Sequence, residues 1–289
     1  MKKLFSLFAV TLFTVAALLT GCGESAPAAA DSLEKMAKYT SPSEATMYVS
    51  LDASTFAPFD SIIKSNLDAD ELKNYAAVMD AMPLSILKTI DESAVVHTPK
   101  VADLKELASK ITDAGARAEL ATITGTDMLL IYADADSDTE IMTIANPEPN
   151  IFVVAETNAV DCVQSATGLD SAIIKQVKKS AEKRNIVVIL PTNDQFSLAL
   201  KKDGDIEFDI RSAELDRETV EMTIAQISMM IPALLQNGEI TAADIAKERE
   251  NVAIAEDGDV VTVSGAISGD FLKKLAAAAA PMIAQQVGK

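Results

Sequence analysis

The stretch "DADSDTE" at Asp134–Glu140 carries the densest set of possible metal ligands in this sequence. Its four carboxylates are those of Asp134, Asp136, Asp138 and Glu140. Their alternate spacing is typical of the start of a calcium-binding loop. Thr139 stands where an EF-hand loop needs glycine, and Ala145 stands where it needs the bidentate glutamate. We therefore predict an acidic turn, with a calcium site at these four residues as the alternative, and no other metal or cofactor.

Histidine occurs once, at His97. A Ser–His–acid triad would have to use this residue, and sites built from several histidines are excluded. The pattern Ser-x-x-Lys resembles the nucleophile motif of penicillin-recognising enzymes, but the companion motifs Ser-Asp-Asn and Lys-Thr-Gly are absent. The pattern occurs at Ser32/Lys35, Ser61/Lys64, Ser85/Lys88 and Ser180/Lys183. Helix-surface neighbours explain all four pairs, so we predict no catalytic residue and no enzymatic activity.

The first residues combine a basic head, an apolar run from Leu4 to Leu19 and an end of small residues. This run is shorter than the roughly 20 residues of a membrane-spanning helix, and its layout is that of a secretory signal. The end, Leu19-Thr20-Gly21-Cys22, resembles the lipobox of bacterial lipoproteins. The resemblance implies cleavage before Cys22, a diacylglycerol on its sulfur and an acyl group such as palmitate on its new amino group. We therefore expect a lipid-anchored protein of the cell envelope.

Gly23, rather than aspartate, follows the lipidated cysteine. By the sorting rule of enteric bacteria, this resembles an outer-membrane lipoprotein, so the periplasmic face of the outer membrane is favoured over the inner membrane. The residues behind Cys22 are small, polar and proline-containing, which predicts a flexible tether. With Cys22 lipidated, Cys162 has no intrachain disulfide partner, and we predict a buried structural thiol there. A nucleophile and a link to another chain are the alternatives for Cys162.

The charge of the chain excludes some classes of partner. The formal net charge is −18. Loss of residues 1–21 removes two lysines and no acid, which leaves 23 basic and 43 acidic residues and a charge of −20. Such a surface repels nucleic acid and anionic lipid headgroups. The absence of tryptophan and the presence of only four tyrosines disfavour a carbohydrate-binding protein.

The first half of the chain predicts a strand, a helical region and a meander. Thr46–Leu51 alternates and is rich in strand formers, so it predicts a strand. Residues 59–122 are predicted to be mostly helical, with one helix starting at Thr98 as N-cap. From residue 128 on, "MLLIYA", "EIMTIA" and "IFVVAE" predict three strands joined by short turns, followed by a helix around residues 159–167.

Two Asp-Gly pairs predict hairpins in the second half of the chain. Asp203-Gly204 joins "FSLALKK" to "DIEFDIRS" through a type I′ turn, and Asp257-Gly258 joins "NVAIAE" to "DVVTVSGAIS". The first hairpin precedes a long amphipathic helix that Pro232 kinks or ends, with Met229 in its core face. Thr241 predicts the capped start of a shorter helix.

These elements predict an α+β fold in which antiparallel hairpins and a meander pack with amphipathic helices. The hairpin–helix unit occurs twice with a looser third copy, so we expect an internal repeat. The expected organisation is a signal peptide (1–21), a lipidated cysteine and tether (22–43), an N-terminal half (44–182) and a C-terminal half (183–289). The two halves form either separate domains or one continuous domain.

Three functions are compatible with these features. The favoured one is a membrane-anchored, non-enzymatic interaction or structural module with an envelope protein as partner. The first alternative is a lipid-tethered solute-binding protein, which an apolar pocket between sheet and helices would support. The second is a hydrolase with a dispersed site, which would need His97 within hydrogen-bond reach of a serine and a carboxylate.

Overall fold

A computed structural model describes most of the chain between residues 29 and 275. The described residues are 29–42, 45–51, 53, 60, 64, 72, 76, 79, 82–89, 93–113, 117–123, 125–132, 139–156, 158–182, 184–190, 194–201, 203–234 and 240–275. They fall into two compact units, unit 1 within Met1–Ala53 and Leu67–Val188 and unit 2 within Ser54–Asn66 and Ile189–Lys289. The signal peptide and the lipidated Cys22 lie outside the described residues.

Unit 1 is built on an antiparallel sheet. In spatial order its strands are β8-β1-β2-β3-β7-β6-β5-β4. Their bounds are β1 Thr46–Leu51, β2 Leu84–Thr89, β3 Ser93–His97, β4 Ala118–Ile123, β5 Thr126–Tyr132, β6 Glu140–Glu148, β7 Ile151–Ala155 and β8 Ile186–Ile189. The neighbouring pairs from β1 to β4 are antiparallel. The predicted opening strand and the predicted three-stranded meander are confirmed as β1 and as β5, β6 and β7.

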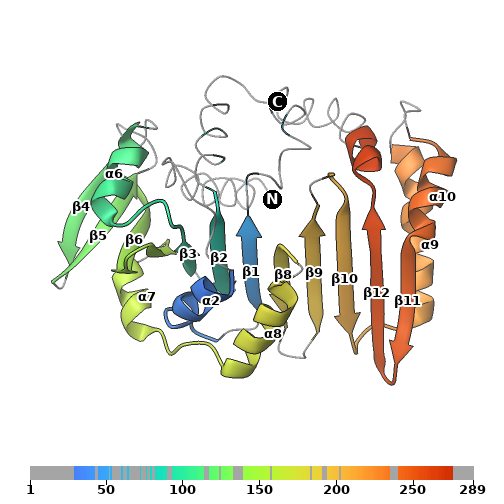
Figure 1. The fold of residues 1–289 in the computed structure, drawn as a ribbon, viewed down its shortest axis with the longest axis horizontal. Coiled ribbons are helices and arrows are strands. Elements are labelled where there is room, and N and C mark those ends of the chain that lie inside the picture. Colours follow the sequence, from blue (N-terminus) through green and yellow to red (C-terminus); the bar gives the residue numbers. More distant parts are fainter. Residues whose placement is uncertain are drawn as a thin grey trace. The chain divides into compact units, whose positions relative to one another are not determined.

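Helices cover both faces of this sheet. The described helices of unit 1 are α2 Ala29–Ala37, α6 Leu104–Asp113, α7 Ala159–Ser165 and α8 Ser171–Ala181. In Figure 1, α2 and α8 lie side by side, and α6 lies over the β4–β5 end of the sheet. On β6, Met142 and Ile144 pack with α6, while the hydroxyl of Thr143 between them accepts a hydrogen bond from the first amide of α7 at 2.8 Å. Coverage on both faces explains why β7 is buried along its whole length.

The structure corrects the predicted helical region of residues 59–122. Its described part contains the strands β2, β3 and β4 as well as the helix α6. Residues 94–96 of β3 are all buried. A continuous apolar run shows neither the helical periodicity nor the alternation of a half-buried strand, so it does not distinguish the two. The helix predicted to start at Thr98 begins at Leu104, and Asp103 accepts the capping hydrogen bonds from Lys105 and Glu106 at 2.9 Å each.

The structure also shortens the predicted tether. Residues 29–37 form α2, and Leu33, Met36 and Ala37 are almost fully buried. The Tyr39 hydroxyl beyond the helix donates to Glu148 at 2.8 Å. Burial and this hydrogen bond raise the pKa of Tyr39 to about 12. Three apolar side chains on one helical face therefore outweigh the small, polar composition that predicted a flexible segment.

The strands of unit 2 are also antiparallel, with the spatial order β9-β10-β12-β11. Its strands are β9 Gln195–Leu200, β10 Ile206–Ser212, β11 Val252–Asp257 and β12 Val260–Ile267, and its described helices include α9 Arg217–Leu234 and α10 Ala242–Glu250. Both predicted hairpins are confirmed. Each is followed by helical residues, as are β6 and β7, while the internal repeat stays a prediction.

The two turns differ in their chemistry. The first has Gly204 at φ 94° and a hydrogen bond from its amide to Lys201, so it is a longer turn closed by a left-handed glycine and not the predicted two-residue type I′ turn. In the second, Asp257 pairs with Val260 and Gly258 has φ 62°. Glycine is the residue that the first central position of such a two-residue turn favours.

The helices of unit 2 agree in part with the sequence. Thr241 caps α10 with a complete capping box formed with Asp244. On α9, Val220 and Ile224 pack on Val261 and Val263 of β12. The helix continues two residues past Pro232 to Leu234. Met229, predicted to lie in the core, is 70% exposed.

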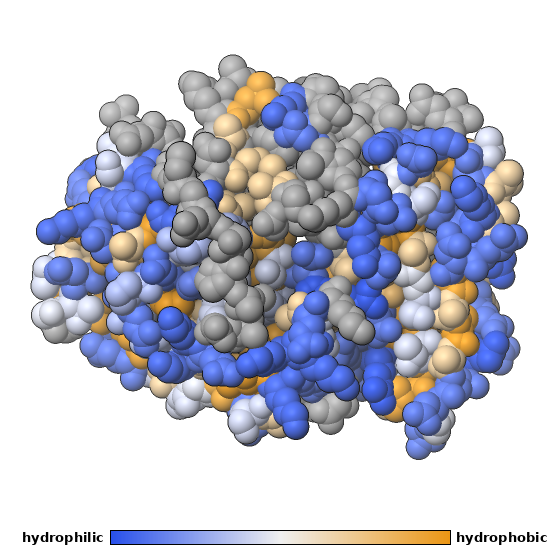
Figure 2. Space-filling view, viewed as in Figure 1, coloured by the Kyte–Doolittle hydropathy of each residue, from blue (hydrophilic) through white to orange (hydrophobic). Residues whose placement is uncertain are grey.

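The surface is mostly polar. On the face that Figure 2 shows, hydrophilic residues predominate and apolar residues form small patches between them. Within the described part of the chain, no helix combines the length and the apolar composition that crossing a membrane would require.

Candidate functional site

The β4–β5 hairpin forms the outer edge of the unit 1 sheet. Its two-residue turn contains Gly125, which has a φ of 81°. The amide of Tyr132 donates to the carbonyl of Arg117 at 3.1 Å, which makes these two residues a hydrogen-bonded pair of the ladder. Hydrogen-bonded and non-hydrogen-bonded pairs alternate along an antiparallel ladder. The residues Ala118, Leu120 and Thr122 therefore direct their main-chain N–H and C=O groups away from β5.

The two faces of this hairpin carry different side chains. On one face, Arg117 pairs with Glu119 at 2.7 Å and lies over the ring of Tyr132, 4.2 Å from its centroid. The other face turns toward α6. There Ala118 packs against the core, Leu120 is 47% exposed, and Thr122 donates to Asp127 at 2.7 Å. Because side chains alternate along a strand, Arg117 and Glu119 lie on one face of β4, and Ala118, Leu120 and Thr122 lie on the face toward α6.

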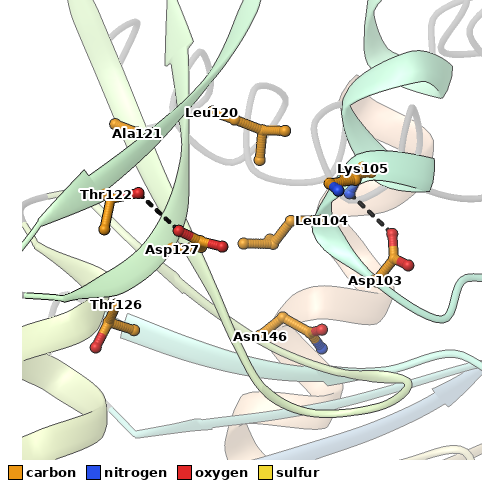
Figure 3. A pocket seen from close by; sticks show the side chains of 9 residues that line it. All are labelled: Asp103, Leu104, Lys105, Leu120, Ala121, Thr122, Thr126, Asp127 and Asn146. Atoms are coloured by element: carbon orange, nitrogen blue, oxygen red, sulfur yellow. Dashed lines mark hydrogen bonds between the residues drawn. The ribbon is translucent and has the colours of Figure 1, made fainter.

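A cavity opens where the hairpin extends beyond the first turn of α6. Its volume is about 360 Å³, at the lower end of the range for small-molecule sites. Figure 3 shows Leu120, Thr122 and Asp127 from the hairpin, Leu104 and Lys105 from α6, and Asn146 from β6 around it. The cavity therefore lies directly beside the edge strand β4.

The polar groups around the cavity are held in place to different degrees. The Asn146 amide donates to the carbonyls of Glu148 and Ile151 at 2.6 and 2.7 Å, which fixes its orientation. Asp103 is used as the N-cap of α6. Among the described residues, no carboxylate forms an ion pair with the Lys105 ammonium. The residues that line the cavity thus include the cation Lys105, the carboxylate Asp127, the hydroxyl-bearing Thr122 and Thr126, and the apolar Leu104 and Leu120.

The histidine lies elsewhere in unit 1. His97 ends β3 and is half-buried. Burial lowers its pKa, and the positive charge of Lys35 lowers it further. Ser85, its partner in the β2–β3 register, accepts hydrogen bonds from Tyr48 and Ser32 at 3.2 and 3.5 Å. No hydrogen bond joins the imidazole to a serine or a carboxylate of the described residues.

The other predicted site residues are placed only in part. Asp134, Asp136 and Asp138 lie outside the described residues, and Glu140 is exposed at the start of β6. No group of three or more His, Cys, Asp or Glu side chains able to hold a metal occurs in the described part of the chain. Cys162 lies on α7 and is half-buried, so the buried thiol that the sequence predicted is more accessible than expected.

The β4 edge and its cavity were not predicted from the sequence. The available signal was Thr124-Gly125 between "AELATI" and "TDMLLIY", because a turn pair between two strand-like runs predicts a hairpin. The first of these runs has the composition of a helix, which hid the strand.

Comparison with known proteins adds no family. No family model matches the chain, and no curated protein matches it in sequence. Two crystal structures of the Treponema protein TP0453 are similar to it. Crystal form I has 9% identity and a TM-score of 0.44 over 85% of this chain and 96% of that chain. Crystal form IV has 10% identity and a TM-score of 0.46 over 82% and 94%. These similarities are too low to assign a function.

Proposed function

We propose that this protein is a lipid-anchored, non-enzymatic component of a bacterial cell envelope that binds an extended segment of a partner protein along β4. The observation that carries the proposal is the edge strand itself. Its outward-facing main-chain groups lie beside a cavity, and the large apolar side chain of Leu120 is exposed between them. An exposed edge of this kind pairs readily with an added strand.

The proposed membrane attachment rests on the lipobox Leu19-Thr20-Gly21-Cys22. A diacylglycerol and an N-acyl chain on Cys22 supply several acyl chains, each stabilising the membrane-bound state by about 0.8 kcal/mol per buried CH₂. Gly23 favours the periplasmic face of the outer membrane. The acidic body supports a protein partner over nucleic acid.

The bound segment would pair as a ninth strand of the unit 1 sheet. Its main chain would exchange hydrogen bonds with Ala118, Leu120 and Thr122, whose amides and carbonyls point outward from the ladder. One of its apolar side chains would cover Leu120 and enter the cavity beside Leu104. Main-chain pairing supplies affinity in this mode, and the side-chain pocket supplies specificity.

The test uses a proline that removes only an outward-facing donor. Leu120→Pro deletes an amide that does not bond to β5, and proline is tolerated on edge strands. A photo-crosslinking residue at Thr122 in the full-length protein should capture a defined adduct in intact cells. We expect Leu120→Pro to abolish the adduct while Leu120→Ala weakens it.

The matched control places the same photo-crosslinking residue at Lys175, which is exposed on α8 and away from β4, and no adduct of the same size is expected there. An adduct at Thr122 that survives Leu120→Pro, or the absence of any adduct at Thr122, would refute strand addition. Circular dichroism of each variant shows whether the fold is intact.

Solute binding is the second candidate, and the cavity is the observation that favours it. Lys105, Asp127 and Thr122 line the cavity of about 360 Å³ together with the apolar Leu104 and Leu120. A thermal melting scan against calcium, EDTA and periplasmic metabolites tests it. Because α2 begins at Ala29, the soluble form should start at Gly23.

A ligand at 100 times its Kd stabilises the folded state by about 2.7 kcal/mol, which raises the Tm by several degrees. A shift that Asp127→Asn removes would favour the solute-binding candidate. A calcium-dependent shift that Asp127→Asn leaves intact would point to Asp134–Glu140. A panel without shifts would leave strand addition as the function to pursue.

A further inference from the structure

Helix α8 of unit 1 differs in charge from the rest of this acidic chain. Its residues Ser171–Ala181 include three lysines and no acidic residue, whereas the whole chain has 43 acidic and 25 basic residues. Among the helices that the structure describes, α8 is the only one whose charged side chains are all basic. Lys175 and Lys179 are exposed on the side of the helix opposite the buried Val177. With Lys178 between them, they form what we call the basic side of α8.

Helix α2 lies beside α8 and is fixed to it (Figure 1). The Glu34 carboxylate of α2 pairs with the Lys178 ammonium at 3.0 Å. The carbonyl of Ala37 accepts a hydrogen bond from the amide of Leu169, just before α8, at 3.0 Å. Because Met36 is also fully buried in unit 1, α2 and α8 form one rigid part of the surface of this unit.

The proposed lipid anchor is close to this pair of helices. Only the six residues 23–28 separate Cys22 from Ala29, where α2 begins. A chain spans at most about 3.6 Å per residue, so Ala29 lies no more than about 25 Å from Cys22. A lipid on Cys22 therefore keeps the start of α2, and α8 beside it, near the membrane surface.

Helix α6 lies on the other face of the unit 1 sheet. On β2, Leu84 packs with the apolar cluster of α6. The hydroxyl of the next residue, Ser85, accepts a hydrogen bond from Ser32 of α2 at 3.5 Å. Successive side chains of a strand point to opposite faces of the sheet, so α2 and α6 cover opposite faces. When α8 faces the membrane, α6 is turned away from it.

We propose that the basic side of α8 rests on anionic phospholipid headgroups of the membrane that holds the anchor, and that this contact sets the orientation of unit 1. The inference rests on the lipidation of Cys22 proposed above. Lysine side chains near an anionic lipid surface are attracted to it. This attraction fades within a Debye length of about 8 Å at physiological ionic strength, so it acts on the cations that the anchor brings close to the lipid.

The acidic remainder of the chain makes the orientation specific. A net charge of −18 repels anionic headgroups, which is why the sequence as a whole disfavours them as a partner. Repulsion of the acidic surface and attraction of the basic side of α8 both favour the same orientation. The short connection to Cys22 favours a lipid surface over an acidic protein segment as the partner of these lysines.

The experiment measures which side of unit 1 faces the lipid in the full-length lipoprotein, held in nanodiscs. A fluorophore is attached at Ala172→Cys on α8 or at Ser109→Cys on α6, both exposed positions, in a Cys162→Ser background. The nanodiscs contain a spin-labelled headgroup as quencher, in phosphatidylcholine with or without phosphatidylglycerol. We expect quenching at residue 172 to be about twofold stronger with phosphatidylglycerol, and stronger than quenching at residue 109.

Charge substitutions identify the lysines that carry the effect. Lys179→Glu should reduce the dependence of quenching on phosphatidylglycerol, and the double variant Lys175→Glu/Lys179→Glu should abolish it. Lys105→Glu makes the same charge change as Lys179→Glu at an exposed position of α6, and it should leave the dependence unchanged. Circular dichroism verifies that each variant is folded.

Mass spectrometry of Cys22 separates this inference from the proposed anchor. If Cys22 carries its lipid but quenching at residue 172 is equal in both lipid mixtures, the inference is overturned and the anchor stands. Stronger quenching at residue 109, or a dependence on phosphatidylglycerol that survives the double variant, would overturn it in the same way. A Cys22 without lipid would refute the anchor and this inference together.

Discussion

Units 1 and 2 both combine antiparallel strands with helices, but the apolar side chains of unit 1 are more completely buried than those of unit 2. Among the described residues, the ten largest fully buried side chains all belong to unit 1, Tyr48, Phe152 and Ile144 among them. In unit 2, the cluster of Val220, Val261 and Val263 is 4–9% exposed. Helices cover both faces of β6 and β7 in unit 1, whereas α9 packs on one face of its hairpins.

The difference extends to the surface. In unit 1, the exposed Leu120 lies on the edge strand β4, where the proposed partner strand would cover it. In unit 2, Met222 and Met229 of α9 are exposed. Matched substitutions in the two units test whether their cores differ in depth.

Removing a core side chain should give the largest effect and the clearest contrast. Ile144 in unit 1 is fully buried, and Ile245 in unit 2 is 7% exposed. We expect Ile144→Ala to reduce the free energy of unfolding by about 4 kcal/mol and Ile245→Ala by about 2 kcal/mol. Urea unfolding followed by circular dichroism measures both. Equal losses would show that the two cores are equally deep.

The substitution Gly265→Ala tests whether the side chains of unit 2 are loosely packed at β12 as well. A Cβ at this position would lie 2.7 Å from the carbonyl oxygen of Asn251 and 3.0 Å from the Phe208 ring. Gly265→Ala should therefore cost about 1–3 kcal/mol of stability through overpacking. The neighbouring Ser264→Ala should change stability by less than about 0.5 kcal/mol. A neutral Gly265→Ala would mean that β11 and β12 shift apart easily.

The helix caps should have smaller effects that separate the units again. Thr241 forms a complete capping box on α10 in unit 2, while the Asp170 carboxylate caps α8 in unit 1 by accepting one hydrogen bond of 2.6 Å from the Ala172 amide. Thr241→Ala should cost about 1 kcal/mol, and Asp170→Ala should cost less. Chemical denaturation of the two variants compares them. A larger loss for Asp170→Ala would contradict the importance that we assign to the box.

The pH dependence of His97 should be the smallest effect. Burial and Lys35 hold its pKa below the usual 6.5, so the unfolded state binds a proton first as the pH falls. Its contribution to stability is therefore full above pH 6.5 and is lost as the pH falls toward the lowered pKa. Because the chain has one histidine, a proton NMR titration reads this pKa directly.

Lys35→Ala should raise the His97 pKa toward 6.5, and His97→Gln should flatten the stability curve below that pH. A pKa above 6.5 in the unmodified protein would instead indicate a carboxylate partner, and would favour the hydrolase alternative.

Local sequence patterns predicted the elements whose signals are self-contained. The short apolar runs "MLLIYA" and "IFVVAE" and the Asp-Gly pairs gave β5, β7 and the two hairpins of unit 2. Thr241 and Asp244 gave the capped start of α10, because a capping box needs only residues within one turn.

The parts that depend on distant contacts could not be predicted in this way. The run "SAVVH" forms β3, and neighbouring elements cover both of its faces, so its sequence does not alternate between apolar and polar residues. α2 is a helix because Leu33 and Met36 are buried in unit 1. The cavity beside Leu120 exists because α6 begins at Leu104, so that its first turn leaves the end of the hairpin uncovered.

Hydrogen exchange with residue-level fragmentation tests the proposed role of β4 most directly. It would compare the protein in isolated envelopes with the purified protein in nanodiscs. In the purified protein, the amides of Ala118, Leu120 and Thr122 should exchange fast, while those of Glu119 and Ala121, which bond to β5, exchange slowly. In envelopes, strand addition predicts slow exchange at all five. Fast exchange at Ala118, Leu120 and Thr122 in both samples would contradict it.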